Sequence, residues 1–129
     1  MLVETVDLLR PAINIVDAIV GMEGNGPTSG TPRAMNMIMA STDGPALERV
    51  AAEIVGIKPA RLRTLQAARE LNVGTPHFDR IDVQGLSIAD ARIADFDLPK
   101  LLPIGFSIPR LVKGAFKNAW LTHQQARSA

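Results

Sequence analysis

A glycine-rich polar stretch separates two apolar runs near the start of the chain. It reads MEGNGPTSG, from Met22 to Gly30, and places Glu23 and Asn25 beside glycines. Glycine permits the positive φ angles that let neighbouring backbone amides point outward together, as an anion-binding loop requires. Two strands can be joined by about 2 to 6 residues, so we expect this longer stretch to be a ligand-facing loop. The alternative is a loop whose glycines only turn the chain, because the stretch matches neither the phosphate-binding loop nor the Gly-x-Gly-x-x-Gly pattern.

Carboxylates occur on both sides of this stretch. Asp17 interrupts the apolar run before it, where an ionised carboxylate is costly to bury unless it is paired, hydrogen-bonded or metal-bound. It could instead accept N–H bonds from the glycine stretch. Asp43 follows the next apolar run, where we expect it to cap a helix. Together with Glu23, these two acids could hold a hard cation such as Mg²⁺. The candidate catalytic residues are therefore Asp17, Glu23 and Asp43, and the candidate ligand-binding residues are Gly24, Asn25, Gly26, Ser41 and Thr42.

Several other chemistries find little support in the composition. The chain has no cysteine, so it can hold no disulfide and no thiolate-bound zinc or iron–sulfur centre. His77 and His123 are far apart in sequence and lack neighbouring ligands, which argues against a zinc site. A net charge of +1, with four Phe, one Trp and no Tyr, argues against a nucleic-acid surface.

The hydrophobic pattern predicts an α/β fold of the layered kind, a mixed or mainly parallel sheet covered by helices. Two runs rich in apolar residues are predicted as adjacent strands buried on both faces, and two later segments as helices packed against them. Gly56 and Gly74 are expected to end those helices. The predicted elements are a short opening helix that Pro11 ends and that carries Leu2, Val6 and Leu9 on one face, strands at Ala12–Val20 and Met35–Ala40, helices at Ala46–Val55 and Ala60–Leu71, and short strands at RIDVQG and DARIADFDL.

The last quarter of the chain differs in charge from the rest. Residues 1–98, predicted as one α/β domain, hold nine basic and thirteen acidic residues, whereas residues 99–129 hold five basic residues and no acid. Within this basic tail, RLVKGAFKNAW has the spacing of an amphipathic helix. We expect it to pack on the domain or to dock on a partner or membrane surface. The sequence shows no apolar run of transmembrane length and no signal peptide, so a cytoplasmic location is expected.

Two stretches, IVDAIVGMEGNGP and ASTDGPALERVA, are followed by LRTLQAARELNVG and IDVQG. Through these motifs, over about Leu2 to Lys100, the sequence resembles the C-terminal half of domain-of-unknown-function family 362, described as uncharacterised iron–sulfur centre proteins. It implies an additional N-terminal half and an association with a ferredoxin-type module that holds 4Fe–4S clusters. Without cysteine, this chain could use such a cluster only on a partner or on a missing module.

Two functions follow as hypotheses. The first is one half of an enzyme, with a small-ligand site at the glycine stretch and iron–sulfur redox chemistry carried elsewhere. The second is a non-catalytic module that docks a ferredoxin-like partner or a missing N-terminal half. In either case we expect the isolated chain to hide an apolar surface, by forming a homo-oligomer or by folding its tail over that surface.

Overall fold

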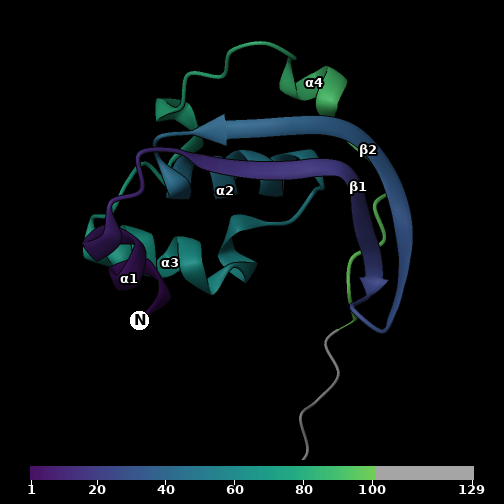
Figure 1. The fold of residues 1–129 in the computed structure, drawn as a ribbon, viewed down its shortest axis with the longest axis horizontal. Coiled ribbons are helices and arrows are strands. Elements are labelled where there is room, and N and C mark those ends of the chain that lie inside the picture. The colour runs from purple at the N-terminus through teal and green to yellow at the C-terminus, as the bar shows by residue number, and fades with distance from the viewer. Residues whose placement is uncertain (101–129) are drawn as a thin grey trace, which may run out of the picture.

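The computed structural model describes residues 1–100, in which helices accompany a two-stranded antiparallel sheet. The mixture of helices and strands is as predicted. The expected mixed or mainly parallel sheet is not found among the described residues, and the predicted C-terminal helix lies outside them. The elements are α1 (Leu2–Leu9), β1 (Asn14–Asn25), β2 (Ser29–Ser41), α2 (Gly44–Ile54), η1 (Pro59–Arg61), α3 (Arg63–Leu71), η2 (Phe78–Arg80) and α4 (Ile88–Ala91) (Figure 1).

The two strands form one long hairpin. Asn14 pairs with Ser41 at one end and Asn25 pairs with Ser29 at the other, so the strands run through most of the glycine-rich stretch. They are adjacent, as predicted, but the stretch is not the long loop that we expected, because its residues pair in the ladder. The connection is residues 26–28, and the Gly26–Pro27 peptide bond is cis.

The hairpin bends sharply near its middle, so that its distal half turns down past the helices (Figure 1). The ladder is irregular between Ala18 and Val20, and Asn36 on the facing strand has φ 54°, a left-handed conformation that Asn tolerates better than most residues. Gly21 lies at this bend, and a Cβ there would come within 2.4 Å of the sulfur of Met35. A residue without a side chain therefore lets Met35 pack against the bent strand.

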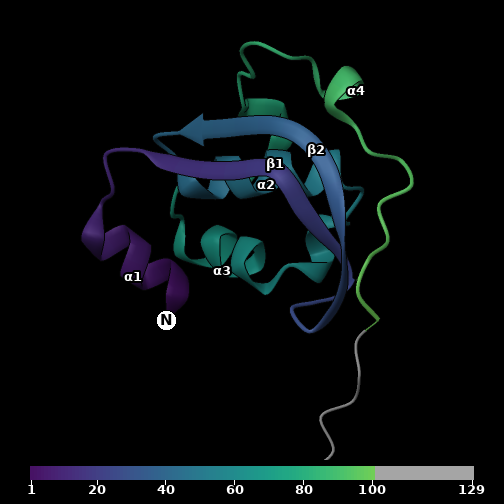
Figure 2. The ribbon, with the colours of Figure 1, turned by 45° about the vertical axis from the view of Figure 1, so that its right-hand side comes forward.

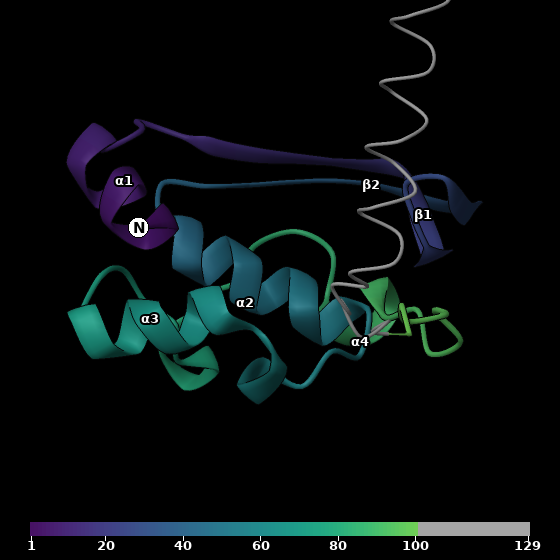
Figure 3. The same ribbon diagram turned by 90° about the horizontal axis from the view of Figure 1, so that it is seen from below.

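The hairpin is covered on one face. Ala18 is buried and the side chains of Met35, Met37 and Met39 are half-buried, whereas the residues that alternate with them are exposed. The prediction that both strands are buried on both faces is therefore wrong. Within the described part of the chain, α2 and α3 lie on the same side of the hairpin, with α2 between the hairpin and α3 (Figure 3). The period-two methionines fill the core on that side.

The helix α2 forms as the sequence predicts. Asp43 caps it by accepting a hydrogen bond from the backbone N–H of Ala46, and a proline occupies its first turn. Leu47, Val50 and Ile54 share its buried face. After the C-cap residue, Gly56 takes a left-handed φ of 73° and turns the chain away.

The segment predicted as a helix at Ala60–Leu71 is interrupted. Leu62 is extended, with φ −97° and ψ 107°, and separates the short 3-10 helix η1 from α3. Helix α3 ends at Asn72, whose φ of 53° makes it the left-handed cap that we had assigned to Gly74. Leu65 is completely buried where α3 packs against α2 and α1.

The two short strands predicted after α3 do not form in this structure. RIDVQG begins with the last residue of η2 and continues in irregular backbone. DARIADFDL contributes the end of α4, then a turn and irregular chain. The side chain of Ser87 caps α4 by accepting from the N–H of Asp90. Ile81, Ile88 and Ile93 nevertheless pack against the core cluster of Val50 and Ile54. Their apolar character thus reflects core packing rather than strand formation.

Candidate functional site

The polar side chains at the tip of the hairpin hold a distant segment of the chain. Glu23 accepts a hydrogen bond from the backbone N–H of Asp97 at 3.2 Å, and Asn25 accepts one from the N–H of Lys100 at 2.8 Å. Between them, the N–H of Gly24 donates to the carbonyl of Asp97 at 2.7 Å. Figure 2 shows the segment that follows α4 running down beside the distal half of the hairpin. Two of the predicted site residues therefore serve as acceptors for backbone within the chain.

An ion pair strengthens the same junction. Arg33 donates to Asp95 at 2.5 Å and lies 3.9 Å from the carboxylate of Glu23. The hydrogen bond from Arg33, assisted by a backbone hydrogen bond and by the guanidinium charge, lowers the pKa of Asp95 below its ordinary value. The same pair raises the pKa of Arg33. Because Asp95 is largely exposed and Arg33 is partly exposed to solvent, the pair orients the chain more than it stabilises the fold.

Asp17 lies on the uncovered face of the hairpin, opposite Ile38. Its side chain is exposed and accepts a hydrogen bond from the backbone N–H of Ile19 at 3.0 Å. The expectation of a buried carboxylate is therefore wrong, because the face that carries Asp17 has no covering layer among residues 1–100. The local hydrogen bond accompanies the irregularity of the strand at this point.

Ser41, Thr42 and Asp43 lie at the other end of the hairpin. Asp43 accepts from the N–H of Ala46 at 2.9 Å, and Ser41 accepts from the N–H of Asp43 at 3.0 Å. Gly74 approaches closely, because a Cβ on it would lie 2.5 Å from the carboxylate of Asp43. The hydrogen bonds of Ser41 and Asp43 hold the first turn of α2 in place. The side chain of Thr42 is exposed.

The three predicted acids do not meet. Asp17 and Glu23 are six residues apart along one strand, or about 20 Å at roughly 3.3 Å per residue in a straight strand. Asp43 follows the end of β2, whereas Glu23 pairs with Thr31 near the tip. Among residues 1–100, no group of three or more acidic or histidine side chains is placed to hold a metal ion. The predicted ligand-binding residues divide likewise between the two ends: Gly24, Asn25 and Gly26 at the tip, and Ser41 and Thr42 at the base.

A different surface stands out on the hairpin. Ile15, Ile19, Val20 and Ile38 are 63%, 49%, 61% and 65% exposed on its central part, and we call these four residues the outer-face patch. The ladder places Ile15 opposite Ala40 and Val20 opposite Ala34, both also exposed. The alternation of residues within β1 is the sequence feature that could have identified this face. Asp17 shares the parity of Ile15 and Ile19, and a charge at the centre of an alternating face indicates that this face is not part of the core.

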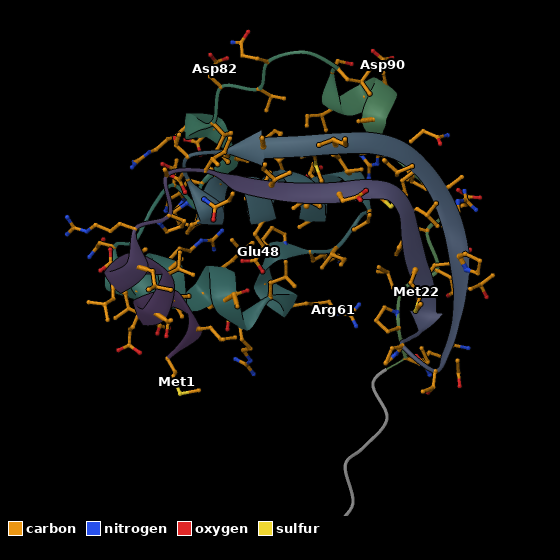
Figure 4. All side chains as sticks on the ribbon, viewed as in Figure 1. Met1, Met22, Glu48, Arg61, Asp82 and Asp90 are labelled. Atoms are coloured by element: carbon orange, nitrogen blue, oxygen red, sulfur yellow. The ribbon has the colours of Figure 1, made fainter. Side chains whose placement is uncertain are left out.

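A cavity of about 300 Å³ lies between β2, α2 and the segment 81–91, which ends in α4. Met37, Met39, Val50 and Ile54 line it from the core side, and Asp82 lies at the other side. Figure 4 shows Asp82 and Asp90 on the segment beyond β2, well away from Met22 on the distal half of the hairpin. Of the predicted site residues, Ser41 contributes to this cavity.

The comparisons confirm the resemblance to this family for the first part of the chain. Residues 1–53 match the family described as "Domain of unknown function (DUF362)". The chain is also similar to a thylakoid-associated protein of Synechocystis sp., with 33% identity over 122 residues that cover 94% of this chain. The chain spans 38% of that relative's length. No solved structure matches the chain significantly.

No helix within residues 1–100 is long and apolar enough to span a membrane.

The exposed apolar side chains concentrate near the start of the chain. Of the fifteen large exposed hydrophobic residues in the described part, eleven lie within residues 1–38, inside the segment that matches the family.

Proposed function

We propose that this chain is a non-catalytic docking module, and that the outer-face patch packs against the complementary part of a longer protein of the same family. The observation that carries the proposal is the hairpin face itself, on which four large apolar side chains stand half to two-thirds exposed. Contiguous apolar surface of this kind marks interaction sites on soluble proteins. Burying a Val or Ile side chain completely is worth about 1.5 to 3 kcal/mol, so such a face can contribute substantially to association.

The choice of partner rests on chain length and on where the apolar residues occur. The chain spans 38% of its thylakoid-associated relative, so most of that relative lies outside the aligned region. The hairpin already packs on α2 through one face, so a second layer would bury the apolar side chains of the other face. A complementary part that supplies the second cover accounts for the exposed patch. The family resemblance implies a ferredoxin-like module as a redox partner, and this link to iron–sulfur chemistry stays a prediction. The cytoplasmic location also stays a prediction.

The contacts at the tip favour docking over catalysis. Glu23 and Asn25 accept backbone hydrogen bonds from Asp97 and Lys100, so a ligand there would compete with the chain's own donors. The enzyme-half hypothesis places its ligand among these same groups. It therefore requires the segment 95–100 to leave the tip before the site can open.

Binding to the complementary part tests the proposal. The probe is the portion of the Synechocystis relative outside the aligned region, titrated against the full chain by isothermal calorimetry. We expect a complex with the unaltered chain, and at least about tenfold weaker binding, or about 1.4 kcal/mol, after Ile15→Lys or Ile38→Lys. The matched control is Leu71→Lys, which places the same charge at a 46% exposed position on α3. Equal binding by all four proteins, or by none, would contradict the proposal.

A further inference from the structure

We propose that the complementary part of the longer protein adds a strand to the edge of β1 that faces away from β2, and that this strand fills an apolar groove beside that edge. The inference rests on the proposed function, which places the same partner on the outer-face patch, and it names a second contact of that partner. An open backbone edge and an apolar groove next to it are the two observations that carry it.

One edge of β1 has no strand beside it in the described part of the chain. The sheet consists of β1 and β2, so each strand is paired along one side. From Asn14 to Val20, no backbone–backbone hydrogen bond within residues 1–100 joins β1 to a segment other than β2. Figure 3, which views the molecule from the side of this edge, shows β1 running from α1 to the bend with no described helix in front of it. A row of open N–H and C=O groups of this kind is a template for another strand.

A groove of about 330 Å³ lies next to this edge, between the hairpin, α2 and the chain that follows α2. Its walls are almost wholly apolar, and they include Val16, Ala18, Met35 and Met39 from the hairpin and Ala51 and Val55 from α2. Asp17 also borders the groove, although it belongs to the exposed set of residues in β1, on the opposite face from Val16 and Ala18. The groove therefore reaches the backbone edge of the strand.

The edge and the groove together fit an extended segment. A strand paired with β1 would point alternate side chains toward the inner face of the sheet, where the groove lies, and the others outward beside Ile15 and Ile19. Residues 14–20 offer about 20 Å of edge at roughly 3.3 Å per residue, which is the length of an ordinary strand. A helix keeps its own backbone hydrogen bonds, so it would leave the edge of β1 unpaired.

The charges at the groove indicate the chemistry of the segment. Asp17 and Glu48 border the groove, and no basic side chain of the described residues does. Opposite charges on neighbouring strands attract, so the segment that fits is apolar on its inner side and carries a Lys or Arg next to Asp17. Between Asn14 and Asn25, β1 itself has two acidic residues and no basic one. Two copies of β1 side by side would bring like charges together, which favours a different partner over a second copy.

Amide exchange followed by NMR tests the strand addition. The probe is again the portion of the Synechocystis relative outside the aligned region, added to the full chain. In the free chain, the amides of residues 14–20 should alternate between slow exchange, where they face β2, and fast exchange, where they face the open edge. With the probe bound, we expect the fast set to exchange at least about tenfold more slowly, because carbonyl groups of the added strand accept these N–H groups.

A substitution in the groove gives an independent measurement. Ala51→Phe should fill the groove and weaken binding of the probe at least about tenfold. The matched control is Ala60→Phe, which adds the same ring at an exposed position of η1 outside the groove, and it should bind as the unaltered chain does. If Ala51→Phe does not fold, the amide exchange of the unaltered chain decides the question.

The outcomes separate this contact from the outer-face patch. If Ile38→Lys weakens binding but the fast amides stay fast and Ala51→Phe binds normally, the docking function stands and the strand addition fails. If Ala51→Phe weakens binding and the lysine substitutions in the patch do not, the strand addition stands and the patch is not the contact. A probe that does not bind overturns both. Protection of the fast amides in the free chain that disappears on dilution would identify a second copy as the occupant and overturn the assignment to this partner.

Discussion

Single side chains in this protein mostly hold backbone in place. Asp43 and Ser87 start helices, and Glu23 and Asn25 accept the N–H groups of a segment more than seventy residues away. The sequence identified three of these four as functional candidates or caps. The sequence could not show whether Glu23 and Asn25 bind a ligand or hold another part of the chain. Their donors are the backbone N–H groups of Asp97 and Lys100, and backbone groups leave no pattern in a sequence.

Replacing the cap residue of α2 should weaken the fold. For Asp43→Ala we expect a loss of about 1 kcal/mol in the free energy of unfolding, because the N–H of Ala46 loses its acceptor. Urea denaturation would measure this loss. Thr42→Ala, next to it and exposed, serves as the control and should change the stability by less than about 0.5 kcal/mol. Equal effects of the two substitutions would contradict the capping role.

The ion pair between Arg33 and Asp95 should be visible in a pH titration. Because the pKa of Asp95 is lower in the folded chain, the pair stabilises the fold above the ordinary pKa of an Asp. That contribution is lost as the pH falls through the lowered value. NMR of the Asp95 carboxyl should therefore give a midpoint below that of an unperturbed Asp, and Arg33→Gln should raise it. An unchanged midpoint in Arg33→Gln would show that the pair does not form in solution.

At the scale of elements, periodicity predicted the helices better than the strands. The helix α2 agrees closely with its prediction because its cap, its apolar stripe and its terminal glycine all lie within one local segment. Leu62 breaks the next predicted helix, although its neighbours favour helix. The strands extend further than predicted because residues 21–25 and 29–34 find partners across the hairpin. Such pairing depends on the facing strand, so a local window does not reveal it.

The tip of the hairpin should act as a clamp on the segment 95–100. In Asn25→Ala, the N–H of Lys100 loses its acceptor, and we expect a cost of about 0.5 to 1.5 kcal/mol at this contact. The amide of Lys100 should then exchange with solvent faster in an NMR experiment, while the amide of Leu65 in α3 is unaffected. Ser29→Ala, at the position paired with Asn25, is the control. Unchanged exchange at Lys100 would contradict the clamp.

The whole molecule has a helical layer on one side of its hairpin and an uncovered apolar face on the other, within residues 1–100. The α/β character and the adjacency of the two strands could be predicted from the sequence. The hydrophobic pattern does not predict the exposed face, because it places Ile15, Ile19 and Ile38 in the core. An apolar residue looks the same in a sequence whether it is buried in the core or exposed on the surface. The charged side chain of Asp17, between Ile15 and Ile19, is the sequence feature that indicates an exposed face.

The bend in the hairpin divides the molecule into regions of unequal resistance to local unfolding. The proximal half rests on α2, whereas the distal half beyond Gly21 turns down past the helices and is held by the strand ladder and by the segment 95–100 (Figure 1). Regions with few buried apolar contacts open at a fraction of the free energy that global unfolding requires. The distal half can therefore open and close while the helical layer stays folded. Each opening would break the hydrogen bond from the N–H of Lys100 to Asn25, so the amide of Lys100 would exchange with solvent at the rate at which the tip opens.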